Sequence, residues 1–206
     1  INKIILQYMI EEILSKKFLN LDKLAENNKE KFLLNKPFPH ISFDNFFNTK
    51  ILNLVLKNFP NLKKKKRVTK FSSEKDKNKI ATNVNFDYPK NINNFLNDLN
   101  SYKFLNFLQK LTSIKETLIT DPYYFGGGLH EIKKSGFLKV HADFNYHPSF
   151  KLDRRINILI YLNKKWKKEY GGELELWNYD MNKCEKKFLP VFNRIVIFNT
   201  NDSLSR

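Results

Sequence analysis

The sequence has one cysteine and no long apolar run, and these absences exclude several classes of protein. Because Cys184 is the only cysteine, no disulfide can form within the chain, which agrees with a reducing compartment. No apolar run reaches the length of a membrane span, and the first residues lack the basic, apolar and small-residue zones of a signal peptide. We therefore expect a soluble, cytoplasmic protein that does not associate with membranes.

Acidic residues are scarce relative to basic ones. The chain has 21 Asp and Glu against 37 Lys and Arg, a net charge of +16, which attracts anionic partners such as nucleic acid. The basic residues are spread over the chain, and AT-rich coding would also produce this bias toward Lys, Asn, Ile and Phe. The run Lys63 to Arg67 and the following SSEKDKNK predict a mobile, solvated loop, with a phosphate-contacting patch as the alternative.

The length of 206 residues indicates one domain with a helical extension. We expect the extension at 1–36, where an apolar stripe over residues 1–19 predicts a packing helix. The main domain then covers 37–206. Pro37 and Pro39 favour an extended entry into the strand HISFDNFF.

The first part of the main domain, residues 37–120, has the pattern of supporting helices. Residues 50–58 predict a helix that stops before Pro60. Residues 91–111 predict two helices separated at Asn100-Ser101, where the serine can cap the second one. These helices are expected to pack on the outside of a sheet.

From Asp121 onward the apolar period becomes that of short strands. The strands expected in residues 121–206 are LHEIK, FLKVHADF, INILIYLN, ELELWN, KKFLP and RIVIF, separated by turn-formers such as Gly171-Gly172 and Asn193. Short strands after a block of helices predict an α+β chain with a double-stranded β-helix (jelly-roll) core. Most aromatic residues then belong to the core, and we assign no chemistry to Phe125, Trp166 and Trp177.

His141 and Asp143 are the strongest candidates for chemistry. In an extended strand, residues two apart project from one face, so the two side chains would lie together while Leu138, Val140 and Ala142 pack behind. An imidazole, a carboxylate and a second His form the facial triad of non-haem Fe(II) oxygenases. An isolated H-x-D pair also arises by chance at the end of a surface strand.

The strand INILIYLN places two polar residues on an otherwise apolar face. Asn157, Leu159 and Tyr161 share this face, and the isoleucines share the other. A buried amide or phenol without a partner costs about 1–3 kcal/mol, so each needs a hydrogen bond. A bound polar ligand can supply it, and for Tyr161 the alternative is a core tyrosine bonded to backbone.

These motifs occur in an order that resembles a known family. H-x-D, YLN, K-x-W, GG-x-L-x-L-W and NR follow one another between Phe38 and Asp202, as in prolyl-4-hydroxylase-like Fe(II)/2-oxoglutarate dioxygenases, which include the hypoxia-factor prolyl hydroxylases. The resemblance implies Fe(II), the co-substrate 2-oxoglutarate and ascorbate as cofactors. It also implies hydroxylation of a prolyl or related residue of a protein or peptide, with succinate and CO2 as co-products.

The resemblance assigns further site residues. Tyr161 matches the tyrosine that contacts the distal carboxylate of 2-oxoglutarate, and Asn157 falls where relatives carry a polar residue facing the same pocket. His130, just before the first barrel strand, lies near a co-substrate contact or has a structural role. Arg154 lies near the mouth, where it meets substrate or pairs with Asp153.

The sequence departs from the family pattern at its end. The second metal-binding His should follow NRIVIF, but an ungapped alignment places Arg206 there, and arginine has no lone pair for a metal. His147 lies outside the metal spacing and is expected to be exposed. We expect the missing His just beyond Arg206, followed by the basic residue for 2-oxoglutarate. The chain is then a fragment of an active oxygenase that binds metal poorly, is inactive by itself and leaves a sheet edge unpaired.

Two other functions fit parts of the sequence. One is the same oxygenase chemistry on a nucleobase or small metabolite, which the positive charge would suit. The other is a non-catalytic basic jelly roll that binds nucleic acid or another polyanion. The sequence predicts no oligomeric state.

Overall fold

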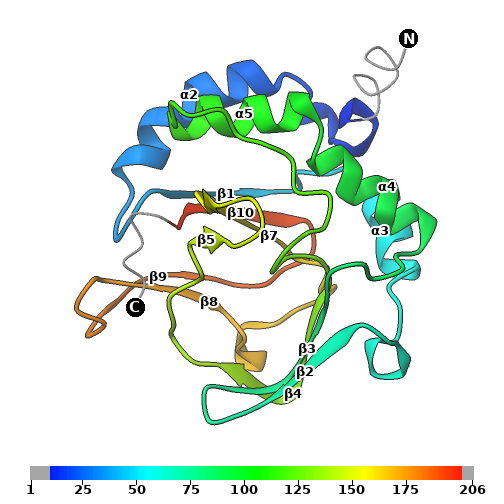
Figure 1. The fold of residues 1–206 in the computed structure, drawn as a ribbon. Helices are drawn as coiled ribbons and strands as arrows, with labels where there is room; N and C mark the ends of the chain where they lie inside the picture. The colour runs from blue at the N-terminus through cyan, green and yellow to red at the C-terminus, as the bar shows by residue number, and fades with distance from the viewer. Residues whose placement is uncertain (1–9, 201–206) are drawn as a thin grey trace.

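The computed structural model describes residues 10–200, in which helices pack against a stack of small antiparallel sheets (Figure 1). The helices are η1 (Lys16–Phe18), α2 (Leu21–Leu34), α3 (Thr49–Lys57), η2 (Leu62–Lys64), α4 (Lys90–Leu99), α5 (Tyr102–Thr112) and η3 (Lys168–Tyr170). The strands are β1 (His40–Asp44), β2 (Val68–Ser72), β3 (Asp76–Thr82), β4 (His130–Leu138), β5 (Tyr146–His147), β6 (Leu152–Asp153), β7 (Ile156–Ile160), β8 (Leu174–Trp177), β9 (Cys184–Phe188) and β10 (Arg194–Asn199). The chain is therefore α+β, as the sequence predicts. Within residues 10–200, no helix is long and apolar enough to cross a membrane.

The helices of the middle region confirm their sequence patterns. α3 coincides with the predicted helix over 50–58, and α4 and α5 are the two helices predicted over 91–111. Ser101 caps α5, because its Oγ accepts a hydrogen bond from the backbone N–H of Phe104 at 3.3 Å. In Figure 1, α2 and α5 lie over one side of the β1–β10–β7 sheet, and α3 and α4 lie at its end.

The N-terminal region differs from its prediction. Residues 1–9 lie outside the described part, and the helical residues that follow end at Ile13, so a helix through residue 19 is wrong. Leu14 instead forms a β-bridge with Phe47, and the backbone N–H of Ser15 donates to the carbonyl of Phe46 at 3.0 Å. Helix α2 was not predicted as a separate element. It begins where the side chain of Asn20 accepts from the backbone N–H of Lys23 at 2.9 Å.

Strands from distant parts of the sequence form the central sheet. β10 pairs antiparallel with β1 on one edge and with β7 on the other, so that Phe198 lies between His40 and Asn157. The buried side chain of Asn193, in the turn before β10, fixes this arrangement. Its amide oxygen accepts from the N–H of Phe47, and its amide nitrogen donates to the carbonyl of Phe47, both at 2.8 Å.

The two faces of β7 pack into different clusters, as the alternation in INILIYLN predicts. Ile156, Ile158 and Ile160 pack against the main core, which the helices cover. Leu159 and Tyr161 pack on the other face, in a second cluster. The buried members of this second cluster come from β8, β9 and β10: Leu176, Phe188, Val196 and Phe198. The hairpin β8–β9 therefore covers the face of the sheet that the helices leave open.

The charged stretch after Lys63 is not a loop, so that prediction is wrong. β2 and β3 form an antiparallel hairpin, and β3 pairs in turn with β4. Exposed lysines alternate here with a few inward residues such as Ile80. β4 joins two predicted strands into one element with a bulge at Gly136, where a Cβ atom would lie 2.7 Å from the side chain of Ile132.

Candidate metal and co-substrate site

His141 and Asp143 lie in an irregular segment between β4 and β5, not in a strand. The predicted strand ends at Leu138, and the last backbone link to the β2–β3 hairpin is the N–H of Lys139, which donates to the carbonyl of Lys75, in the turn before β3, at 2.8 Å. The apolar residues expected to pack behind the pair are exposed: Leu138, Val140 and Ala142. The strand prediction is wrong here because, within residues 10–200, no neighbouring strand pairs with residues 140–145.

The structure nevertheless brings the two side chains together. The Nε2 atom of His141 lies 3.4 Å from Oδ1 of Asp143. The other ring nitrogen, Nδ1, lies 2.8 Å from the carbonyl oxygen of Lys139, which accepts the Nδ1 proton and leaves the Nε2 lone pair toward Asp143. When Nε2 is protonated it donates to Asp143, and this hydrogen bond is the main cause that raises the pKa of His141.

Two residues near β7 support the carboxylate of Asp143. The side-chain amide of Asn157 donates to Oδ2 at 2.6 Å, and Nη1 of Arg154 lies 3.9 Å from the same oxygen. Burial alone would raise the pKa of Asp143, but the hydrogen bonds from His141 and Asn157 and the charge of Arg154 outweigh it and lower the pKa. The carboxylate is therefore held in its charged form.

Arg154 is part of this cluster and does not pair with Asp153. Its guanidinium lies over the ring of Phe144, 4.4 Å from the ring centroid, and Nη1 donates to the carbonyl of Phe144 at 3.4 Å. The backbone N–H of Arg154 donates to the carbonyl of Asn145 at 2.7 Å. These contacts fold the segment that carries Asp143 back onto the start of β7.

His130 is the first residue of β4, where it pairs with Ala81, so it does not precede the strand. Its side chain is exposed, although part of the ring is withdrawn from water. This partial desolvation is the main cause that lowers its pKa, and the charge of Lys79 lowers it further. The charges of Arg154 and Asp143 also act on the ring, so His130 lies near the His141–Asp143 pair.

Tyr161 follows β7 and projects into the second apolar cluster. Withdrawal from water raises the pKa of its phenol, and the charge of Arg194 opposes this effect. The backbone of Tyr161 is fixed by two bonds to the turn before β10: its N–H donates to the carbonyl of Arg194 at 3.0 Å, and its carbonyl accepts from Asn193 at 2.9 Å. Its hydroxyl makes no hydrogen bond within residues 10–200, so the structure does not show the backbone-bonded core tyrosine.

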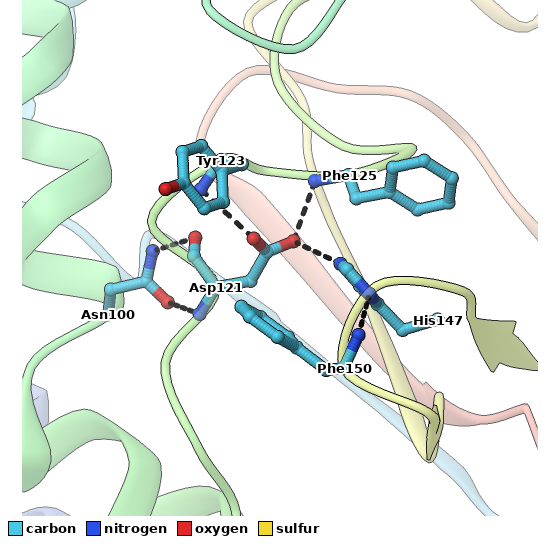
Figure 2. Close-up of polar contacts among 6 residues, drawn as sticks. All are labelled: Asn100, Asp121, Tyr123, Phe125, His147 and Phe150. Atoms are coloured by element: carbon cyan, nitrogen blue, oxygen red, sulfur yellow. Dashed lines mark hydrogen bonds and ion pairs between the residues drawn. The ribbon is translucent and has the colours of Figure 1, made fainter.

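His147 is mostly buried, which corrects the expectation that it is exposed. Its side chain is 13% exposed, and its ring stacks on Phe150 with the centroids 4.4 Å apart (Figure 2). Nδ1 accepts the backbone N–H of Phe150 at 3.2 Å, and Nε2 faces Oδ2 of Asp121 at 3.9 Å. These contacts of His147 therefore hold the β5–β6 hairpin, which follows Asp143, in place.

Asp121, the other member of this contact, organises the loop before β4. Its carboxylate accepts the backbone N–H groups of Tyr123 at 3.0 Å and Phe125 at 2.6 Å (Figure 2). The backbone of Asp121 exchanges two hydrogen bonds with the side chain of Asn100, at the junction of α4 and α5. Neither Asp121 nor His147 was found from the sequence, because the contacts that join Asp121 to Asn100 and to His147 span about 20 residues or more and no local motif connects them.

The donor set at His141 and Asp143 fits a divalent transition metal. An imidazole nitrogen with a free lone pair and an anionic carboxylate oxygen converge, and each is oriented by a further hydrogen bond, as first-row metal ligands in proteins are. Within residues 10–200, no group of three or more His, Cys, Asp or Glu could hold a metal ion. The pair therefore offers two of the donors that a metal site needs, and the predicted second His stays a prediction.

Comparison with known proteins shows which family and which fold the chain resembles. Residues 127–205, which include His141 and Asp143, match the model of the 2OG-Fe(II) oxygenase superfamily. Among solved structures, the chain is similar to a prolyl hydroxylase from Trichoplax adhaerens in complex with a hypoxia inducible factor oxygen degradation domain peptide fragment. The two share 16% sequence identity over 89% of this chain and 81% of that chain, with a TM-score of 0.59. This likeness implies a jelly-roll core, and the family in general uses Fe(II) and 2-oxoglutarate. These findings support a 2OG-Fe(II) oxygenase, an enzyme of the dioxygenase and hydroxylase type, with a prolyl hydroxylase-like fold.

Proposed function

We propose that the protein hydroxylates a prolyl or related residue of a protein or peptide substrate, with 2-oxoglutarate consumed and succinate and CO2 released. The observation that carries the proposal is the convergence of His141 Nε2 and Asp143 Oδ1 at 3.4 Å within the residues that match the oxygenase family. A peptide substrate is supported by the similar prolyl hydroxylase, which is in complex with a peptide fragment. Ascorbate dependence and a cytoplasmic location stay predictions from the sequence.

The proposed roles follow from the contacts of each side chain. His141 provides a neutral nitrogen ligand because the Lys139 carbonyl holds the proton on Nδ1. Asp143 provides the anionic ligand, and Asn157 keeps its carboxylate in orientation. Iron held by these residues would supply the redox chemistry of the reaction with the 2-oxo acid and dioxygen. Arg154, beside Asp143, is placed to meet the substrate or the co-substrate at the site.

We also propose that Tyr161 binds the distal carboxylate of 2-oxoglutarate. Its phenol projects between the β10–β7 sheet and the β8–β9 hairpin, where a co-substrate would lie in a double-stranded β-helix. The hydroxyl is free of partners within residues 10–200 and can donate to a carboxylate. Asn157, on the same face of β7, is already engaged by Asp143, which favours a role in holding the metal ligand over direct contact with 2-oxoglutarate.

The experiment that tests the proposal replaces Asp143. Asp143→Ala should abolish Fe(II)-dependent succinate formation and weaken Mn(II) binding measured by calorimetry, because the anionic ligand is lost. Asp153→Ala is the matched control, since this exposed aspartate lies on β6 and makes no ion pair within residues 10–200. Undiminished succinate formation in Asp143→Ala would show that the metal is elsewhere.

A further inference from the structure

Basic residues gather on one hairpin and the turn that leads into it. We define the basic hairpin as residues 63–79, which comprise the end of η2, β2 and most of β3. Its nine basic residues are Lys63, Lys64, Lys65, Lys66, Arg67, Lys70, Lys75, Lys77 and Lys79. Glu74 and Asp76 are the only acidic residues in this range, so it contributes +7 of the net +16. The charge is therefore less dispersed than the sequence suggested.

These charges have no acidic partners of their own. Within residues 10–200, none of the nine basic side chains forms an ion pair. Elsewhere in the described residues some cations are paired, as in Lys110 with Asp22 at 2.9 Å and Arg155 with Glu116 at 3.1 Å. Unpaired like charges in one place repel one another, and an anionic partner relieves this repulsion.

The basic hairpin ends beside the candidate metal site. Its residue Lys75 accepts the backbone N–H of Lys139, two residues before His141. The charge of Lys79 acts on the rings of both His130 and His141. Figure 1 shows β2, β3 and β4 as one small sheet that extends away from the helices. A polymer bound along this sheet would reach the site at its β4 end.

A groove at the other end of the hairpin has room for side chains of a partner. It encloses about 810 Å³ and is lined by Lys64, Lys65, Lys66, Arg67, Asn85, Phe86 and Asp87. Asp87 is its one acidic residue. The guanidinium of Arg67 donates to the carbonyl of Asn85, which leaves the lysines as the free cations of the groove.

We propose that the basic hairpin binds an acidic segment of the polypeptide substrate and so brings the residue to be hydroxylated to His141 and Asp143. This inference rests on the proposed function and names the substrate class. Carboxylates are favoured over nucleic acid because the hairpin offers no free aromatic face on which a base could stack. Its one aromatic residue, Phe71, is covered by the Lys79 ammonium, 4.7 Å from the ring centroid.

The test measures binding, which does not depend on turnover. Fluorescence anisotropy of the chain of residues 1–206 is recorded with two labelled peptides of equal length. Both have a central proline, flanked by glutamate in one peptide and by glutamine in the other. A single-stranded oligonucleotide of the same net charge as the glutamate peptide is the third probe. The glutamate peptide should bind at least about tenfold more tightly than the glutamine peptide, and this difference should shrink at high salt.

Two variants of equal charge locate the binding surface. The hairpin variant is Lys63→Gln, Lys64→Gln, Lys65→Gln and Lys66→Gln, which should lose most of the preference for glutamate. The control variant is Lys16→Gln, Lys23→Gln, Lys29→Gln and Lys31→Gln, on η1 and α2, which should keep it. All eight side chains are exposed, so both variants should have the unfolding midpoint of the parent.

Three outcomes would overturn the inference. Equal losses in the two variants would assign binding to net charge alone, and equal affinity for the two peptides would remove the acidic preference. Tighter, hairpin-dependent binding of the oligonucleotide would assign the surface to nucleic acid. Failure of the proposed function would look different, as absence of Fe(II)-dependent succinate formation while the preference for the glutamate peptide persists.

Discussion

The helix-covered core and the segment that carries the candidate site differ in how they are held. The core consists of apolar side chains fully removed from water, among them Phe46, Phe47 and Phe107. Residues 139–155 instead have exposed apolar side chains, such as Val140 at 38%, and are held by polar contacts. Stability therefore resides mainly in the helix-covered half, whereas the chemistry resides where few apolar contacts are made.

The polar contacts of the site segment are few and specific. The Lys139–Lys75 link fixes its start, and the bond from Arg154 to Asn145 closes its end. The side chain of Asn157 holds Asp143 in between. Substitutions in the two regions should therefore change different measurements, with core variants changing the free energy of unfolding and site variants changing binding.

The largest effect on stability is expected from Phe47→Ala. Phe47 is 0% exposed and packs edge-on against Phe46 and Phe95, with ring centroids 4.9 and 5.0 Å apart. Removing a buried phenyl ring costs about 3–5 kcal/mol, because apolar burial is lost and a cavity remains. The free energy of unfolding in urea measures this loss.

A matched substitution in the other region sharpens the comparison. Phe137, near the end of β4, is 42% exposed, so Phe137→Ala should cost less than about 1 kcal/mol. Equal losses in the two phenylalanine variants would mean that the site region contributes to global stability as much as the helix-covered core.

A smaller change in the free energy of unfolding, a gain instead of a loss, is expected from Asp98→Asn in α4. Asp98 is 5% exposed, and burial, together with the nearby charge of Glu12, raises its pKa from 3.8 to about 6. The folded state thus keeps a proton that the unfolded state releases, and stability from this group is complete below pH 3.8 and is lost as pH rises through 6. A tenfold change in proton affinity is worth about 1.4 kcal/mol, so the loss at pH 7 is about 3 kcal/mol.

The variant removes this pH dependence. Asp98→Asn should raise the free energy of unfolding at pH 7 by up to about 3 kcal/mol, and the gain should vanish near pH 4. Urea unfolding at several pH values measures it, with Asp180→Asn, at an exposed aspartate, as the control. A gain that is the same at pH 4 and pH 7 would show that the charge of Asp98 is not its cause.

The parts of the fold that the sequence predicts are those with a strong apolar period. α3, α4 and α5 follow the helical repeat, and β7 and β10 are apolar runs between turn-formers. The same reasoning placed His141 and Asp143 side by side, although the strand assumed for them ends at Leu138. Their contact survives because the Lys139 carbonyl orients the imidazole from within the same segment.

The parts that were not predicted depend on contacts distant in sequence. Most side chains of the β2–β3 hairpin are exposed, and many are charged. The few inward residues therefore form no clear strand pattern in the sequence, although β3 pairs with β4. The burial of His147 depends on Phe150, in the turn of the same β5–β6 hairpin, and on Asp121, in the loop before β4. The bond between Asn157 and Asp143 joins β7 to a segment without regular structure, and no spacing rule predicts it.

The last effect is on co-substrate binding and concerns Tyr161. Its ring packs against the second apolar cluster, whereas its hydroxyl is proposed to meet the carboxylate of 2-oxoglutarate. Tyr161→Phe keeps the ring and loses one charge-assisted hydrogen bond, worth about 1.5–3 kcal/mol. The dissociation constant for 2-oxoglutarate should therefore rise about 10- to 150-fold, at about 1.4 kcal/mol per decade. The unfolding midpoint should change little, because the hydroxyl has no partner within residues 10–200 to lose.

Tyr179→Phe, at an exposed tyrosine beyond β8, is the control and should change neither quantity. A lower midpoint with an unchanged dissociation constant would make Tyr161 a structural residue and remove it from the co-substrate site.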